Sequence, residues 1–301
     1  MNLFSKRETI QQNIAFMAIM AAINIVLSVI SAIVPFMSIF LFLLMPLTSA
    51  LVEFFCKDRY YPIYFAASIG LSLVATLWNT ETTFFYLIPS LLTGYIFGLV
   101  SKKSIPSIYS ILISSLIQMG CLLGFIPLVN FIYGTDVILT FKTLLNLQDS
   151  TKINVIIPAF IFLISLIQMC LSYAIISNEL KKMNIEEKHI QKYEWIYQLL
   201  LFVFSLLMIP SSFFIKEISF VLLFINIFLA VYIIKDYIIS KNYYTLIVFL
   251  GGLVINIIVF ATAYVTLGTI DGFLLLNITP FWISFISLIV SFLKRESKKI
   301  E

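Results

Sequence analysis

The sequence contains few charged residues. Of its 301 residues, 11% are Asp, Glu, Lys or Arg, against about 25% in an average soluble protein. Hydrophobic residues make up 61%, against about 45–50%, and the mean hydropathy is +1.06. A water-soluble globule needs a charged surface, so lipid must surround most of this chain. This composition excludes a cytosolic enzyme, a secreted disulfide scaffold and a nucleic-acid binder.

Cysteine and histidine are scarce as well. Cys56, Cys121 and Cys170 lie far apart, in or next to apolar segments, so we expect packing residues and neither disulfides nor a zinc site. The single histidine, His189, lies in a charged segment, and no H-E-x-x-H, P-loop or G-x-G-x-x-G motif occurs. We therefore expect no catalytic residues, no metal, no cofactor and no enzyme activity.

Long apolar segments dominate what is there. A membrane span takes about 20 mostly apolar residues, and ten segments qualify. They are residues 13–34, 37–55, 62–78, 83–100, 106–132, 153–177, 195–214, 218–234, 243–266 and 273–293. The sequence thus predicts an all-α, polytopic membrane protein with about ten transmembrane helices.

The basic residues support this topology independently. With the N-terminus in the cytoplasm, the inner loops hold 16 of the 19 Lys and Arg residues, and the outer side holds only Lys142, Lys152 and Lys216. Because Lys and Arg gather in cytoplasmic loops, we expect a multi-pass protein with both termini in the cytoplasm.

Two connections are longer than the others. In the outer one, from Tyr133 to Lys152, the apolar centre 137–145 is too short to span, so we expect an interfacial or re-entrant helix. The inner one has Glu and Lys at spacings that allow surface pairs, which is typical of a solvated helical linker. We place that linker at 179–194, between a six-helix bundle (1–178) and a four-helix extension (195–301).

Polar groups inside the spans are few. Glu53 is the only acidic residue well inside one, and it is either a snorkelling residue paired near Lys57 and Arg59 or a proton carrier. The neutral polar residues in or near spans are Asn24, Gln118, Asn130, Gln168, Asn256 and Asn277. Such groups either hydrogen-bond between helices, at about 0.6 kcal/mol each, or contact a ligand.

Two local patterns point to binding. Residues 78–86 read Trp-Asn-Thr-Glu-Thr-Thr-Phe-Phe-Tyr, which is the composition of either a small-molecule pocket or an aromatic belt with a tight turn. Ala15, Ala18 and Ala22 share one helix face, where small side chains let another backbone approach closely. That face could receive a helix of the same chain or of a partner protein.

Residues 14–22, Ile-Ala-Phe-Met-Ala-Ile-Met-Ala-Ala, and the run 92–100, Leu-Thr-Gly-Tyr-Ile-Phe-Gly-Leu-Val, followed by Lys102-Lys103, resemble the S component of energy-coupling-factor (ECF) vitamin transporters. The resemblance covers about the first 178 residues. It implies that the alanine face docks on the transmembrane T component, and that ATPase subunits on other chains supply the energy. It also implies a small-molecule ligand near the outer face, under the loops at 78–83 and 133–152.

The candidate substrate-binding residues are therefore Trp78, Asn79, Glu81, Tyr86, Asn130 and Tyr133. Over its full length the chain resembles the YybS-like membrane proteins of Gram-positive bacteria, which implies the bacterial cell membrane. Two other functions remain open at this point. They are a membrane scaffold without transport activity, and a secondary transporter built from five plus five helices in inverted repeats.

Overall fold

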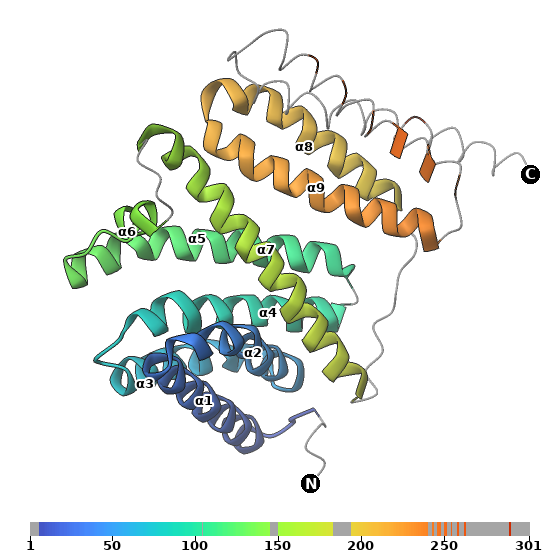
Figure 1. The fold of residues 1–301 in the computed structure, drawn as a ribbon. Helices are drawn as coiled ribbons and strands as arrows, with labels where there is room; N and C mark the ends of the chain where they lie inside the picture. The colour runs from blue at the N-terminus through green and yellow to red at the C-terminus, as the bar shows by residue number, and fades with distance from the viewer. Residues whose placement is uncertain are drawn as a thin grey trace, which may run out of the picture. The chain divides into compact units, whose positions relative to one another are not determined.

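The fold of the chain is helical throughout the part that the computed structural model describes (Figure 1). That part comprises residues 6–103, 105–144, 150–182 and 194–239, with nine single positions beyond residue 242. Within it no strand is present. Apart from those single positions, the predicted spans 243–266 and 273–293 lie outside the described residues, as do Asn256 and Asn277. The all-α prediction is confirmed for the described part of the chain.

The helices follow the predicted spans closely. They are α1 (Ile10–Ile33), α2 (Pro35–Phe55), the 3₁₀ turn η1 (Asp58–Tyr60), α3 (Tyr61–Ala75), the π-helical segment η2 (Thr82–Leu87), α4 (Ile88–Lys103), α5 (Ser107–Tyr133), α6 (Val137–Leu144), α7 (Ser150–Lys182), α8 (Glu194–Phe214) and α9 (Lys216–Ile239). Each of the first eight predicted spans is a helix, and α6 is the short helix predicted around 137–145.

Five stretches of these helices are long and apolar enough to cross a membrane. They are Ile10–Ile33, Thr82–Lys103, Ser107–Tyr133, Ile156–Lys182 and Lys216–Lys235. These apolar helices are thus compatible with an integral membrane protein. The finer count of ten spans stays a prediction.

Local sequence explains where the helices begin and end. Thr9 caps α1 in a capping box with Gln12, and Pro35, which suits a first turn, starts α2. Gly134 ends α5 with a φ of 61°, a left-handed conformation that glycine adopts at little cost. Asp136 then caps α6, because its Oδ1 accepts a hydrogen bond from the backbone N–H of Leu139 at 3.0 Å.

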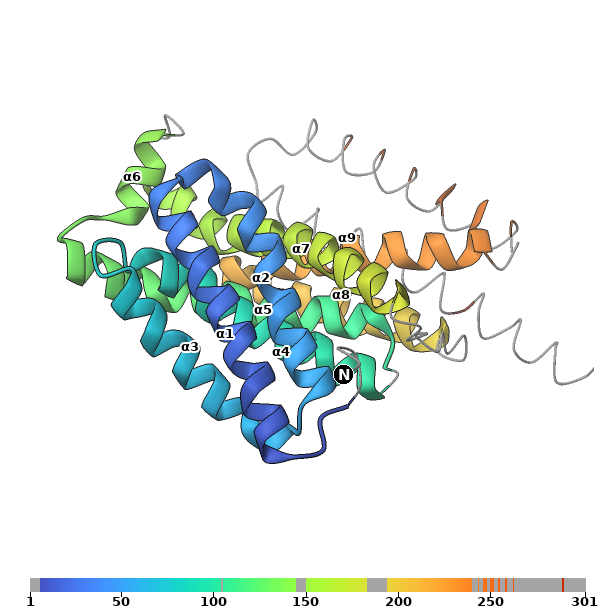
Figure 2. The same ribbon diagram turned by 90° about the horizontal axis from the view of Figure 1, so that it is seen from below.

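The chain divides into two compact units, residues 1–148 with 161–190 (unit 1) and residues 149–160 with 191–301 (unit 2). In unit 1, α1 packs against α2 and α3, α2 packs against α4, and α4 packs against α5. Figure 2 shows α1 between α3 and α2. In unit 2, α8 and α9 form an antiparallel hairpin around Ile215, held by a hydrogen bond from Gln198 to the Tyr237 hydroxyl.

The two ends of unit 1 differ in charge. The basic end comprises residues 6–9, 56–60 and 101–103, and the opposite end comprises residues 76–83 and 133–137. α1 and α3 both start at the basic end, because Asn13 of α1 contacts Lys57 just before α3. The two helices therefore run in parallel.

Unit 1 exposes large apolar side chains and buries several polar ones. The outward face of α1 exposes Ile14, Ile19 and Val26 by more than half of their surface, whereas Asn13 and Asn24 on its other face are fully buried. Water-soluble proteins keep large exposed apolar patches small. An apolar exterior with polar groups kept inside suits a lipid environment, and it indicates a membrane-embedded protein.

Helices α2 and α4 approach each other closely. A Cβ atom added at Gly94 would lie 2.3 Å from the carbonyl oxygen of Pro46, and one added at Gly98 would lie 2.6 Å from the Cβ of Glu53. Gly94 and Gly98 thus form a G-x-x-x-G pair that lets two helix backbones meet in an apolar environment. The packing of α4 on α2 depends on these two residues having no side chain.

Candidate functional site

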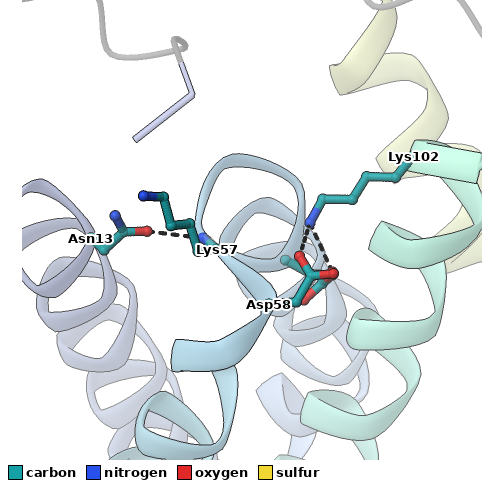
Figure 3. A network of polar contacts seen from close by, with 5 residues as sticks. Asn13, Lys57, Asp58 and Lys102 are labelled. Carbon is teal, nitrogen blue, oxygen red and sulfur yellow. Dashed lines mark hydrogen bonds and ion pairs between the residues drawn. The ribbon is translucent and has the colours of Figure 1, made fainter. Parts of the chain in front are cut away.

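Polar contacts at the basic end join three segments of unit 1 (Figure 3). Lys102 Nζ, on the last turn of α4, lies 2.9 Å from Glu53 Oε1 and 2.5 Å from Asp58 Oδ1. Asn13 Oδ1 accepts a hydrogen bond from the backbone N–H of Lys57 at 2.9 Å. The ends of α2 and α4 and the start of α1 are therefore tied together around η1.

Glu53 is paired, but its partner differs from the prediction. One of the two alternatives was a snorkelling side chain paired near Lys57 and Arg59; instead the Glu53 side chain has no exposed surface and pairs with Lys102. Arg59 points elsewhere, since its Nη2 donates to the Tyr60 hydroxyl at 2.6 Å. The close approach at Gly98 brings α4 and Lys102 over Glu53, a contact between residues 49 positions apart that no local pattern reveals.

Two groups outside the apolar spans have shifted pKa values. The hydrogen bond from Lys102 holds the pKa of the Asp58 carboxyl below its usual range. Burial raises the pKa of the Cys56 thiol to about 11, so this cysteine stays protonated at neutral pH. Among the residues that the structure describes, no three His, Cys, Asp or Glu side chains gather closely enough to hold a metal ion.

In the middle of unit 1, a second polar cluster joins α1, α2 and α3. Asn24 Nδ2 donates to the Tyr64 hydroxyl at 2.7 Å, and Asn24 Oδ1 accepts from Thr48 Oγ1 at 2.6 Å. Gln118 of α5 likewise donates to Gln168 of α7. The predicted hydrogen bonding between helices is confirmed for Asn24, Gln118 and Gln168.

A third polar cluster lies at the opposite end, where α3 meets η2. Ser72 Oγ and Thr83 Oγ1 are hydrogen-bonded at 2.8 Å, and Thr76 Oγ1 donates to the carbonyl of Ser72 at 2.8 Å. All three side chains are fully buried. η2 is π-helical from Thr82 to Leu87, a rare geometry that is frequent at functional sites. No pattern in the sequence predicts this wider helical turn.

The predicted substrate-binding residues surround this end but do not converge on one point. Tyr133 reaches the 78–83 loop, where its hydroxyl lies 2.9 Å from both N and Oγ1 of Thr80. Asn130 Oδ1 accepts from the backbone N–H of Val137 at 3.0 Å and so fixes the start of α6. Trp78 is 61% exposed.

The other three candidates lie in or beside η2. Asn79 accepts a hydrogen bond at its carbonyl from Thr82 Oγ1, Glu81 directly precedes η2, and Tyr86 is half-buried within it. The structure thus links the two predicted loops through Thr80, which was not a candidate, and Tyr133. A binding role for the six residues stays a prediction.

The alanine face of α1 is open. Ala15, Ala18 and Ala22 are all exposed, while Phe16, Met17 and Ala21 of the same helix are buried in unit 1. Within the described chain, then, no helix of unit 1 uses this face. Of the two occupants left open by the sequence, a helix of the described part of unit 1 is ruled out.

Comparison of the chain with family models, with curated proteins and with solved structures finds no match.

Proposed function

We propose that this protein is the substrate-binding membrane subunit of an uptake system whose other chains provide a transmembrane partner and ATPases. The proposal follows the resemblance to S components of ECF transporters. The observation that carries it is the exposure of Ala15, Ala18 and Ala22 along one face of α1. A face of small residues in lipid favours a second helix, because close backbone approach increases van der Waals contact.

The contrast with α4 supports this reading of α1. Both helices carry small residues four apart, Gly94 and Gly98 on α4 and Ala18 and Ala22 on α1. The glycine pair is covered by α2, whereas the alanine pair is exposed. A small-residue face that is left uncovered suits a helix supplied by a partner.

The opposite end supports the binding half of the proposal. There the 78–83 loop is tied to the end of α5 through Thr80 and Tyr133, beside the π-helical η2. Loops fixed by a rigid bundle are common places for ligand contact. The ligand would be a small, vitamin-like molecule bound on the outer side.

The test is co-purification from host membranes of the wild-type chain and of Ala18→Leu and Ala22→Leu. Added bulk should separate the docked helices, so both variants should lose a transmembrane partner and a co-purifying ATP hydrolase that the wild type retains. The matched control is Ala67→Leu, which changes an exposed alanine of α3 and should keep both.

Two outcomes contradict the proposal. If all three variants retain the ATP hydrolase equally, α1 is not the docking helix. If the folded wild-type chain brings down no ATP hydrolase at all, a scaffold without transport activity explains the chain better.

A further inference from the structure

The interior of unit 1 contains a line of neutral polar side chains between α1 and α3. On α1, Asn24, Ser28 and Ser31 are spaced at i, i+4 and i+7 and so share one face. That face looks toward α3, because Asn24 donates to the hydroxyl of Tyr64. All four residues are buried.

The facing side of α3 continues the same pattern. Tyr64, Ser68, Ser72 and Thr76 recur every four residues, and each is at most 2% exposed. Because α1 and α3 run in parallel, their polar faces stay alongside each other from Asn24 toward the opposite end. There Ser72 and Thr76 meet Thr83 of η2. We call this set, with Asn24, Ser28 and Ser31, the polar column.

Three members of the polar column, Ser28, Ser31 and Ser68, have unmet hydrogen-bonding capacity. Ser28 Oγ and Ser31 Oγ are buried and have no hydrogen-bond partner among the described residues. A buried serine in a helix can instead donate to its own backbone, as Ser115 does to the carbonyl of Ile111 at 2.7 Å. A buried hydroxyl without a partner is unfavourable, and an ordered water or a bound molecule would satisfy it.

The chemistry of the polar column limits what it can bind. Its members are Asn, Ser, Thr and Tyr, and the ion pairs of Glu53 and Asp58 with Lys102 lie at the basic end, past Asn24. A charged ligand would find no countercharge in these side chains and would lose its hydration. Hydroxyl and amide groups both donate and accept, so they match a ligand rich in hydroxyl groups.

We infer that the polar column binds a small, uncharged molecule with several hydroxyl groups, which enters from the end formed by η2. The inference rests on the proposed function for the idea that the protein carries a ligand, and on Ser28 and Ser31 for the site. It places recognition deeper in unit 1 than Trp78 and Asn79. The π-helical turn of η2 covers the column at its entrance.

Single cysteines test this access. In a chain with Cys56, Cys121 and Cys170 changed to alanine, Ser28→Cys and Ser31→Cys are each treated with methyl methanethiosulfonate, a small neutral thiol reagent, in lipid nanodiscs. The matched control is Ser115→Cys, a buried position whose hydroxyl is already paired. Because thiol modification requires access to the sulfur, both column positions should react about tenfold faster than the control.

Glycerol, erythritol and inositol serve as the ligand probes. At least one should slow modification at Ser28→Cys saturably. It should also bind about five- to tenfold more weakly to Ser28→Ala in equilibrium dialysis, as expected for one lost hydrogen bond. The inference is overturned if the column positions react no faster than Ser115→Cys, or if none of the three polyols protects them.

The docking variant keeps the two proposals separable. Ala18→Leu alters only the exposed face of α1, so it should leave modification at Ser28→Cys unchanged even if it abolishes partner binding. Failure of polyol protection with intact docking would remove the polar column as a site and leave the uptake subunit standing. Protection by a polyol without any partner would support the column and contradict the multi-chain assembly.

Discussion

The buried ion pair between Glu53 and Lys102 makes the sharpest stability prediction. Lys102→Met removes the ammonium but leaves the Glu53 carboxylate inside unit 1, where its side chain has no exposed surface. Removing one partner of a buried pair typically costs about 3–5 kcal/mol, because the remaining charge is uncompensated. Since the Lys102 side chain is 21% exposed, we expect the lower end, about 3 kcal/mol.

The second carboxylate provides an internal comparison. Asp58 also contacts Lys102, but its side chain is 59% exposed, so water compensates for a lost partner. Asp58→Asn should therefore cost less than about 1 kcal/mol. The double variant Glu53→Gln/Lys102→Met removes both buried charges. Its loss of stability should be about 2 kcal/mol smaller than the summed losses of the single variants Glu53→Gln and Lys102→Met, a normal coupling for residues in contact.

The assay is reversible unfolding of the purified chain in mixed micelles, followed by circular dichroism. It compares the wild type with the single variants Lys102→Met, Glu53→Gln and Asp58→Asn and with the double variant. A Lys102→Met loss no larger than that of Asp58→Asn would refute the reasoning. If the losses of Glu53→Gln and Lys102→Met simply add up in the double variant, the reasoning is refuted equally, because Glu53 and Lys102 would then not interact.

Two further predictions use the same unfolding assay. Gly98→Ala should destabilise by about 1–3 kcal/mol, because the added methyl group meets Glu53. Gly120→Ala on α5, with open space around it, should be neutral or stabilising; equal losses would contradict the α2–α4 packing. Asp58 has a lowered pKa, so its stabilisation is complete above the ordinary value of 3.8 and is lost as the pH falls through its folded-state pKa. Asp58→Asn should therefore weaken the acid dependence of stability below pH 3.8, and an unchanged dependence would contradict this.

Apolar runs made the helices of this chain predictable. Each helix interior is a long apolar segment, so the eight spans between residues 13 and 234 appear as helices with ends shifted by a few residues. The span predicted to end at residue 78 ends at Ala75, because Thr76 leaves the helical conformation and donates its hydroxyl back to Ser72. The capping signals of Thr9 and Gly134 are local and can be read directly from the sequence.

Contacts between distant segments were not predictable in the same way. Lys102 was counted as a basic residue of a loop, but the glycine pair on α4 carries it onto Glu53. The G-x-x-x-G spacing is visible in the sequence, yet only packing shows that α2 is its partner. Ser28 and Ser31 carried no signal alone, because serine is common in helices of membrane proteins and its burial depends on which face meets α3.

We propose that unit 1 crosses a membrane with its basic end on the cytoplasmic side. The most direct measurement labels single cysteines at two exposed positions, Lys103→Cys and Asp136→Cys, with a membrane-impermeant maleimide in intact expressing bacteria and in permeabilised ones. We expect labelling of Asp136→Cys in intact cells, and of Lys103→Cys only after permeabilisation. Labelling of both positions from the same side of the membrane would contradict it.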